Sequence, residues 1–206
     1  MKHIWLNTVL NRPWLTLLIG ILLIMAAATG GQNLYFRGDY KVFFGDNNPQ
    51  LTAFEQMQST FNKNENASII IAPKSGNVFS KETLTLIKDM TYQAWLTPNS
   101  SRVDSISNYQ HTWAQEDDLI VEDLVPDIEL IDQQTIARAR EVALKEPNLV
   151  NRMVSEKGHV AVINVTVRLP DADTPETALD ASVAVNDITG YITKMTDEYK
   201  EQYPDH

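Results

Sequence analysis

The sequence predicts an α+β protein in which one apolar N-terminal helix precedes a large domain of alternating strands and helices. The helix is indicated by residues 13–31, PWLTLLIGILLIMAAATGG, which carry no charged side chain. The domain is indicated by residues 32–206, in which short β-branched runs alternate with longer segments of helical periodicity. Elements that alternate in this way bury their apolar sides by packing helices on a sheet.

Charge and composition exclude several classes of function. The 206 residues carry a formal net charge of −10, from 27 acidic and 17 basic side chains. Nucleic-acid binding depends on clustered lysine and arginine side chains, so this excess of acidic residues argues against a nucleic-acid partner. The chain has no cysteine, which excludes disulfides, thiolate catalysis and cysteine-ligated zinc.

The uncharged stretch at 13–31 has the features of a transmembrane helix. Its length is close to the roughly 20 residues that span a bilayer. Arg12 stands directly before it and predicts that residues 1–12 stay in the cytoplasm. A cleaved signal peptide is the alternative, because the Ala-Ala-Ala sequence at 26–28 fits a cleavage site. Both interpretations place residues 32–206 outside the cytoplasm.

In the first half of the domain, capping residues mark where helices begin. Asn48 and Ser80 are good N-caps, and Phe79 and Leu84 stand at the two positions of a hydrophobic staple. The expected elements are strands at 33–44, 68–72 and 102–108, a hairpin of 111–113 and 119–124, and helices at 49–62 and 81–96.

The second half repeats this order. Asp132 is an N-cap between Ile131 and Ile136, a second staple pair. The expected elements are a helix ending near 146, a hairpin of 149–154 and 159–169, and a last helix from 175 to about 203. We therefore expect split β-α-β units of the ferredoxin-like kind, in two subdomains divided near 126–131. Too few residues follow Pro204 for a returning strand, so strand 159–169 should lack one neighbour.

No group of residues predicts catalysis or metal binding. The three histidines of the domain have no HxH or HExxH partner, and the acidic runs lack the spacing of a calcium loop. There is no G-x-S-x-G elbow and no glycine-rich phosphate loop. We therefore predict no enzyme and no catalytic, cofactor-binding or metal-binding residue. The residues considered were His111, His159, His206, 116–118, 122–123, 171–173, and the glycosylation-type sequences at Asn66, Asn99 and Asn164.

Four segments, taken in order, resemble a known family. They are RPWLTLLIGILLI at 12–24, FRGDYKVFFGDNNPQLTAFEQMQ at 36–58, RVDSISNYQHTWAQEDDLIVEDLV at 102–125 and ALKEPNLVNRMVSEKGHVAVINVTVRLP at 143–170, and the most specific parts are 39–54 and 117–124. Together they are similar to the resistance–nodulation–division (RND) exporters, and more closely to the MMPL-type, hydrophobe/amphiphile-exporter branch. The resemblance extends over nearly the whole chain, from about residue 12 to residue 206.

The resemblance implies a proton-driven exporter of lipidic or amphiphilic compounds in the bacterial inner membrane. The chain would be its N-terminal part, with the first transmembrane helix at 13–31 and a periplasmic porter domain at 32–206. The family's proton-carrying acidic residues lie in later helices and have no counterpart in 13–31. The implied partners are the lipid bilayer, the remainder of the transporter or a second copy of it, and a hydrophobic or amphiphilic substrate. The alternative function is a periplasmic binding or interaction module led by a signal peptide.

Overall fold

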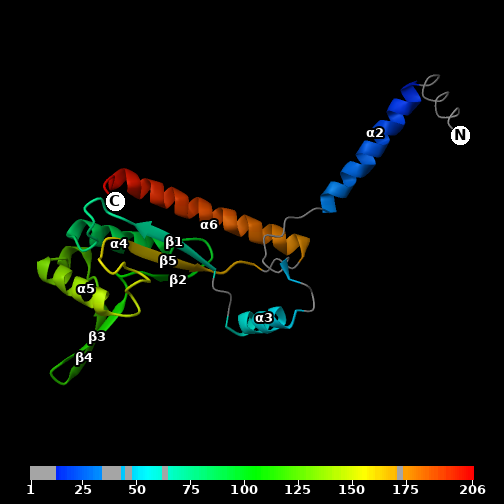
Figure 1. Ribbon diagram of the computed structural model, residues 1–206. Helices are drawn as coiled ribbons and strands as arrows, with labels where there is room; N and C mark the ends of the chain where they lie inside the picture. Colours follow the sequence, from blue (N-terminus) through cyan, green and yellow to red (C-terminus); the bar gives the residue numbers. More distant parts are fainter. Residues whose placement is uncertain (1–12, 34–42, 45–47, 62–64, 171–173) are drawn as a thin grey trace.

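The computed structural model describes residues 13–33, 43–44, 48–61, 65–170 and 174–206, and it confirms a mixed α+β protein. Figure 1 shows the helix nearest the N-terminus standing apart from the body that holds the sheet and the long C-terminal helix.

The helices begin where the sequence offers capping groups. The Asn48 Oδ1 atom accepts a hydrogen bond from the backbone two residues later at 2.9 Å, and Ser80 Oγ accepts one from three residues later at 3.1 Å. Asp132 and Thr174 begin the later helices with capping boxes. The helices are α2 (Pro13–Thr29), α3 (Pro49–Phe61), α4 (Lys81–Ala94), α5 (Gln133–Lys145) and α6 (Pro175–Gln202), with the 3₁₀ turns η1 (Gly30–Asn33) and η3 (Ile128–Leu130).

The described strands form a three-stranded sheet and a separate two-stranded hairpin. The sheet has the order β1-β5-β2, and its central strand β5 is antiparallel to both neighbours. Every second residue of β5 is buried, namely Ala161, Ile163, Val165 and Val167. The strands are β1 (Glu65–Ile71), β2 (Ser100–Asp104), β3 (Gln110–Gln115), β4 (Asp118–Asp123) and β5 (Ala161–Val167).

Strands β1 and β2 run parallel to each other, because each is antiparallel to β5 between them. Helix α4 connects them, so β1, α4 and β2 form a split β-α-β unit. The pairing brings Ile69 opposite Ile163 and Val103 opposite Val165. These four side chains are buried, which places the core on the same face of all three strands.

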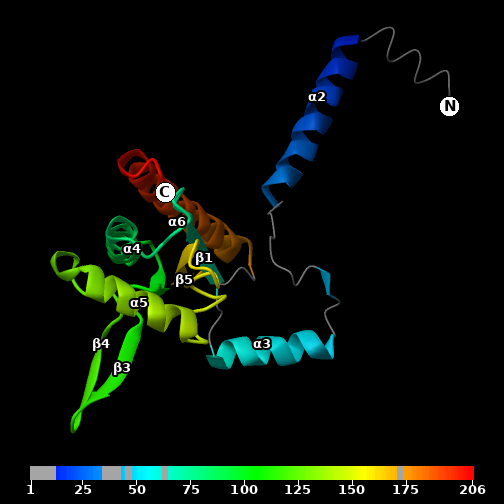
Figure 2. The same cartoon turned by 60° about the vertical axis from the view of Figure 1, so that its left-hand side comes forward.

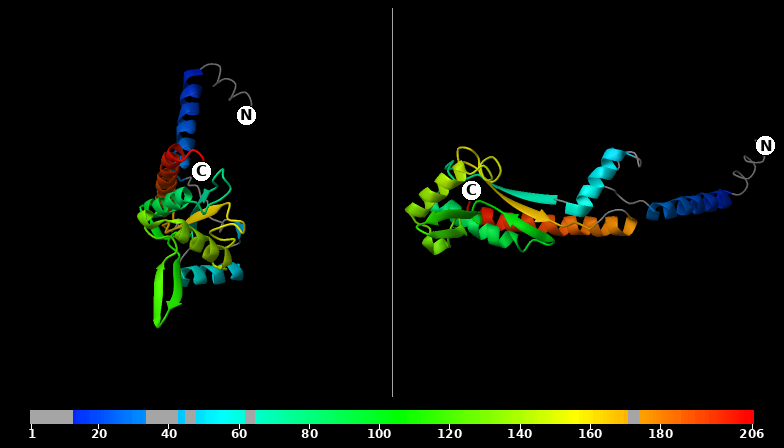
Figure 3. Two further views of the ribbon diagram at one scale, coloured as in Figure 1. Left: turned by 90° about the vertical axis from the view of Figure 1, so that its left-hand side faces the viewer. Right: turned by 90° about the horizontal axis from the view of Figure 1, so that it is seen from below.

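Helices α4 and α6 cover that apolar face of the sheet (Figures 1 and 3). The Tyr191 hydroxyl of α6 donates to the Gln93 carbonyl of α4 at 3.0 Å, so the two helices lie side by side. The core residues that α4 and α6 contribute include Leu84, Ile87, Met90, Ile188 and Met195.

Helix α5 packs beside the start of α4, and the β3–β4 hairpin projects from that end of the body (Figure 2). The Arg140 guanidinium lies 5.6 Å from the centre of the Phe79 ring. Phe79 is also covered by Gly158, where an added Cβ would lie only 2.7 Å from the ring and where φ is +68°. Only glycine satisfies both conditions without strain, so Gly158 closes this part of the core.

The apolar N-terminal segment forms a helix, as expected, but α2 ends at Thr29 rather than at residue 31. The next residues form η1. Within the described part of the chain, no helix combines the length and the apolar character needed to cross a membrane. The structure therefore supports the helix and does not support the expected transmembrane assignment. The expected cytoplasmic segment 1–12 lies outside the described residues.

Most of the expected strand at 33–44 also lies outside the described residues. The first residue of that expected strand, Asn33, is the last residue of η1 and is not in a strand. The helices expected at 49–62, 81–96 and 175–203, the strand at 68–72 and the hairpin around 115–118 are confirmed to within a few residues.

The hairpin expected from 149–154 and 159–169 is wrong in its first arm. Asn151 has φ +63°, and this left-handed residue reverses the chain where an extended arm was expected. The segment instead folds into turns in which Leu149 and Val154 are buried, with single β-bridges from Val154 to Val150 and Ala161. These apolar side chains are part of the core although they lie in a loop and not in a strand.

The strand expected at 102–108 is half right, because β2 ends at Asp104. The Asn108 side chain accepts from the Ser105 backbone N–H at 2.9 Å and donates to the Val103 carbonyl at 2.8 Å. A side-chain amide that bonds its own backbone in this way favours a turn over a strand.

The expected free edge lies on another strand. Strand β5 has neighbours on both sides, and the outer edge of β1 has no partner among the described strands. The expected boundary near 126–131 does not separate two sheets either, because β5 from the second half pairs with β1 and β2 from the first. The two halves share one sheet, with a single split β-α-β unit in the described chain.

Replacing the central buried side chain of β5 should destabilise the domain. We expect Ile163→Ala to lower the free energy of unfolding by about 2–4 kcal/mol, because Ile163 is fully buried. Ile70→Ala is the matched control: Ile70 is on the paired strand but 69% exposed, and its loss should cost less than about 0.5 kcal/mol. Urea unfolding of the full chain in detergent micelles, followed by circular dichroism, measures both. Equal losses would show that β5 is not the centre of the core.

Candidate functional site

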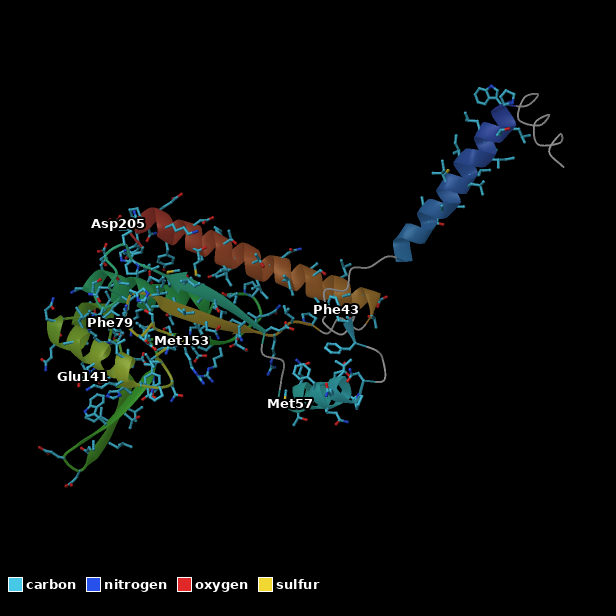
Figure 4. All side chains as sticks on the ribbon, viewed as in Figure 1. Phe43, Met57, Phe79, Glu141, Met153 and Asp205 are labelled. Carbon is cyan, nitrogen blue, oxygen red and sulfur yellow. The ribbon has the colours of Figure 1, made fainter. Side chains whose placement is uncertain are left out.

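The most conspicuous open surface is helix α2. None of its residues is buried, although it is apolar almost throughout. Leu23 is 65% exposed and Ile24 is 70% exposed, near the middle of the helix. Figure 4 shows the side chains of α2 pointing outward on all sides, with no other described element packed against them. A helix that is apolar all round needs an apolar surrounding, which this fold does not supply.

A second open surface is the β3–β4 hairpin. One face is held by α5: the Arg138 guanidinium stacks 4.9 Å from the centre of the Trp113 ring and forms an ion pair with Glu122. The other face carries Leu119, 71% exposed, and Val121, also exposed. An isolated two-stranded hairpin is only marginally stable, so Arg138 of α5 and Lys88 of α4, which forms an ion pair with Asp123, support this projecting arm.

The three histidines considered from the sequence lie on three separate elements. His111 stacks on Trp113 in the hairpin, with ring centres 5.3 Å apart. His159 bonds Ser155 at 2.9 Å in a loop, and the His206 Nε2 atom lies 2.9 Å from the Thr83 hydroxyl. They do not form a joint site.

The acidic runs do not gather into a metal site. Glu116 and Asp117 form the exposed tip of the hairpin, and Asp118 begins β4. Among the described residues, no group of three His, Asp or Glu side chains is arranged to hold a metal ion. The run at 171–173 lies outside the described residues.

A buried set of hydroxyl groups lies between α4 and the turn after β2. The Ser105 Oγ atom is 2.9 Å from Thr91 Oγ1 and 2.8 Å from Ser107 Oγ. The remaining partners of these groups are the Ile87 carbonyl, the Ser107 backbone N–H and the Asn108 side-chain oxygen, so no base activates a nucleophile here. The set fixes the turn against α4.

Two of the three glycosylation-type sequences, those at Asn66 and Asn164, meet on the open face of the sheet, and the third, at Asn99, stands before β2. Asn66 lies opposite Thr166, and Ser68 lies opposite Asn164, because the two sequences run antiparallel on β1 and β5. Thr166 Oγ1 bonds Asn66 Oδ1 at 2.9 Å. This uncharged polar ladder keeps the second face of the sheet compatible with water, whereas the sequence alone showed only isolated motifs.

The C-terminal residues fold back onto the loop after β1. The Lys74 backbone N–H donates to the Asp205 carbonyl at 2.7 Å, and Lys74 Nζ contacts the Asp205 carboxylate at 3.0 Å. The Tyr199 hydroxyl of α6 donates to the Asp89 carboxylate of α4 at 2.6 Å. These contacts tie the end of α6 to both α4 and the end of β1.

A mainly apolar groove follows from this arrangement. It lies where the open edge of β1 meets the last turns of α6. Its apolar lining is Ile69, Ile70, Ile71, Leu86, Met90, Tyr199 and Tyr203, and Thr196, Lys200 and His206 add polar groups. Sequence reasoning missed this groove because its residues are spread over three elements. The only sequence signal was the continuous Ile69-Ile70-Ile71 run, which was assigned to a buried strand.

Comparison of the chain with family models, with curated proteins and with solved structures finds no match in any of the three. The structure therefore has to be interpreted from its own surfaces: the exposed apolar helix, the hairpin, and the groove beside β1.

Replacing Tyr199 should remove a pH-dependent contribution to stability. Burial, followed by the hydrogen bond to Asp89, raises the pKa of the Tyr199 hydroxyl well above its ordinary value of 10.0. The folded state therefore holds this proton more tightly than the unfolded state. The resulting stability is present below about pH 10 and is lost as the pH rises above it.

We expect Tyr199→Phe to cost about 1 kcal/mol at neutral pH, and to reduce the loss of stability as the pH rises above about 10. The exposed Tyr92 on α4 provides the control variant Tyr92→Phe, which should retain the wild-type slope. Urea unfolding at each pH measures the effect. A wild-type slope in Tyr199→Phe would contradict the assignment.

Proposed function

We propose that this chain is a membrane-anchored extracytoplasmic module, and that it serves as the N-terminal part of an exporter for lipidic or amphiphilic compounds. Helix α2 would be the anchor, and residues 32–206 would lie on the periplasmic side of a bacterial inner membrane. The observation that carries the proposal is that no residue of the apolar helix α2 is buried, beside a folded domain that has its own core.

The length of α2 sets how it could meet a bilayer. Its 17 residues extend about 26 Å as an α-helix, against a hydrocarbon core of about 30 Å. Trp14 is exposed at its first turn, where an aromatic ring suits the membrane interface. Small mismatches of this kind are accommodated by local thinning of the bilayer. The alternative to lipid is water, in which this many exposed leucine and isoleucine side chains are costly.

The architecture of the domain supports the exporter part of the proposal. A split β-α-β unit directly follows the N-terminal segments, as the resemblance to RND exporters implies for a ferredoxin-like porter domain. Helix α2 contains no acidic, basic or histidine side chain, so the proton-coupling groups of such an exporter would lie outside this chain. The chain would act with the remainder of the transporter and not alone.

Acidic residues in α2 should release the chain from membranes. We expect Leu18→Asp with Leu22→Asp to move the chain from the membrane fraction to the soluble fraction, because each central Asp costs about 2.5–3.5 kcal/mol in lipid. The control is Leu96→Asp with Leu130→Asp, since these leucines of the domain are similarly exposed. Carbonate extraction and ultracentrifugation measure the partition. Soluble, uncleaved wild-type chain would contradict the anchor.

The mass of the recovered protein separates the anchor from the signal-peptide alternative. A mature N-terminus at Thr29 would indicate cleavage after Ala28 and a released periplasmic module. Single-cysteine variants then report topology, because the chain has no cysteine of its own. We expect Ser101→Cys to react with an impermeant maleimide in spheroplasts, and Asn7→Cys to react only after lysis.

The exporter function has a separate test. With the two α2 substitutions introduced into the chromosomal gene, cells should retain an amphiphilic fluorescent dye longer than wild-type cells. Cells with the Leu96→Asp and Leu130→Asp control should not. If dye efflux is unchanged in cells whose chain has left the membrane, the proposed export function is wrong, and the proposal that α2 is a membrane anchor still stands.

A further inference from the structure

The outer edge of β1 has the properties of a binding site for a polypeptide strand. Strand β1 is the end of the three-stranded sheet, and no described strand pairs with its outer side. An unpaired edge presents a row of backbone N–H and C=O groups to any extended chain. Proteins usually block such edges with lysine, proline or a bulge. The seven residues of β1, ENASIII, contain no lysine or proline, and their pairing with β5 shows no bulge.

The groove beside this edge is suited to apolar side chains. Ile69 and Ile71 of β1 form one wall, and Tyr199 and Tyr203 at the end of α6 form another. A strand added to β1 would direct every second side chain toward this lining and the others toward the open face, where Ile70 is exposed. The groove therefore selects a strand with apolar residues at alternate positions.

The structure also shows how such a strand would enter. The Lys74 N–H, just beyond the end of β1, already donates to the Asp205 carbonyl from the outer side. Backbone N–H groups alternate between the two sides of a strand, and the Val162 N–H of β5 donates to the Met153 carbonyl, away from β1. The residues on either side of Val162 therefore face their partners Ile69 and Ile71, and the N–H groups of Ser68 and Ile70 point to the outer side of β1. The contact at Asp205 lies just beyond the end of β1, and within the described part of the chain no strand pairs with Ser68 or Ile70 on the outer side.

We propose that the outer edge of β1 binds an extended strand of a partner polypeptide, antiparallel to β1 and with apolar residues at alternate positions. The backbone of β1 would supply the hydrogen bonds, and the groove would supply the specificity for apolar side chains. A second copy of this chain is a poorer occupant, because two copies that each carry a net charge of −10 repel each other. The inference is independent of where α2 lies.

A peptide with the sequence of residues 159–168, HVAVINVTVR, is a suitable probe. It contains β5, which pairs antiparallel with β1 on the inner side and has apolar residues at alternate positions. We expect saturable binding of the fluorescently labelled peptide to the full chain in detergent micelles. Two N-methylated peptides test the pairing: methylation of the alternate amides on one edge should abolish binding, and methylation of the other edge should not.

Substitution at Ile70 locates the binding site. Ile70→Pro removes an outward N–H from an edge strand, where proline is tolerated, and should weaken binding at least tenfold. Ile70→Ala removes the same exposed side chain, keeps the N–H and should bind within about twofold of wild type. Amide hydrogen exchange should slow at Ser68 and Ile70 when the peptide is bound. Slower exchange at these outward amides indicates that the peptide adds to the free edge of β1. Displacement of β5 by the peptide would leave them unprotected.

Three results would overturn the proposal: no saturable binding, equal binding of the two N-methylated peptides, or a dimer of the chain that protects the same β1 amides without peptide. If Ile70→Pro fails to fold, the methylated peptides and the exchange pattern still test whether the peptide binds to the outer edge of β1. Loss of membrane binding in the α2 variants would leave all of these results unchanged, so the failure of one proposal is distinguishable from the failure of the other.

Discussion

Strand β5 is the element on which the rest of the domain depends. It lies in the middle of the sheet, and its inward face of Ala161, Ile163, Val165 and Val167 is almost completely buried. Because β5 comes late in the chain and its neighbours come early, the sheet joins segments that are separated in the sequence by α5 and the hairpin. This pairing is non-local, and it joins the two halves of the sequence in a single sheet.

The position of β5 explains the two surfaces that remain open. Helices α4 and α6 cover only one face of the sheet, so the other face carries the polar ladder of Asn66, Ser68, Asn164 and Thr166. The central place of β5 leaves β1 and β2 as the edges. Helix α6 then returns along the sheet to the end of β1, where Asp205 contacts Lys74. The groove beside β1 is a consequence of this return.

Local signals predicted most of the elements, and non-local pairing accounts for most of the errors. The N-caps at Ser80 and Asp132 and the staple at Phe79 and Leu84 act within a few residues, so the sequence alone placed their helices correctly. The predicted strand at 149–154 was wrong, because the segment forms a turn around Asn151 and its apolar side chains reach the core from that turn. The free edge and the groove could not be predicted, because strand order depends on contacts between distant segments.

Helix α2 is apolar almost throughout and has no buried side chain. An isolated helix of this length is marginal in water, whereas in lipid its backbone hydrogen bonds have no competing solvent. Amide hydrogen exchange of α2 in lipid nanodiscs therefore tests the central claim most directly. We predict that the amides near Leu18 and Leu23 exchange at least a hundredfold more slowly than an unstructured peptide of the same sequence. Exchange close to the unstructured rate would show that α2 is not held in the bilayer.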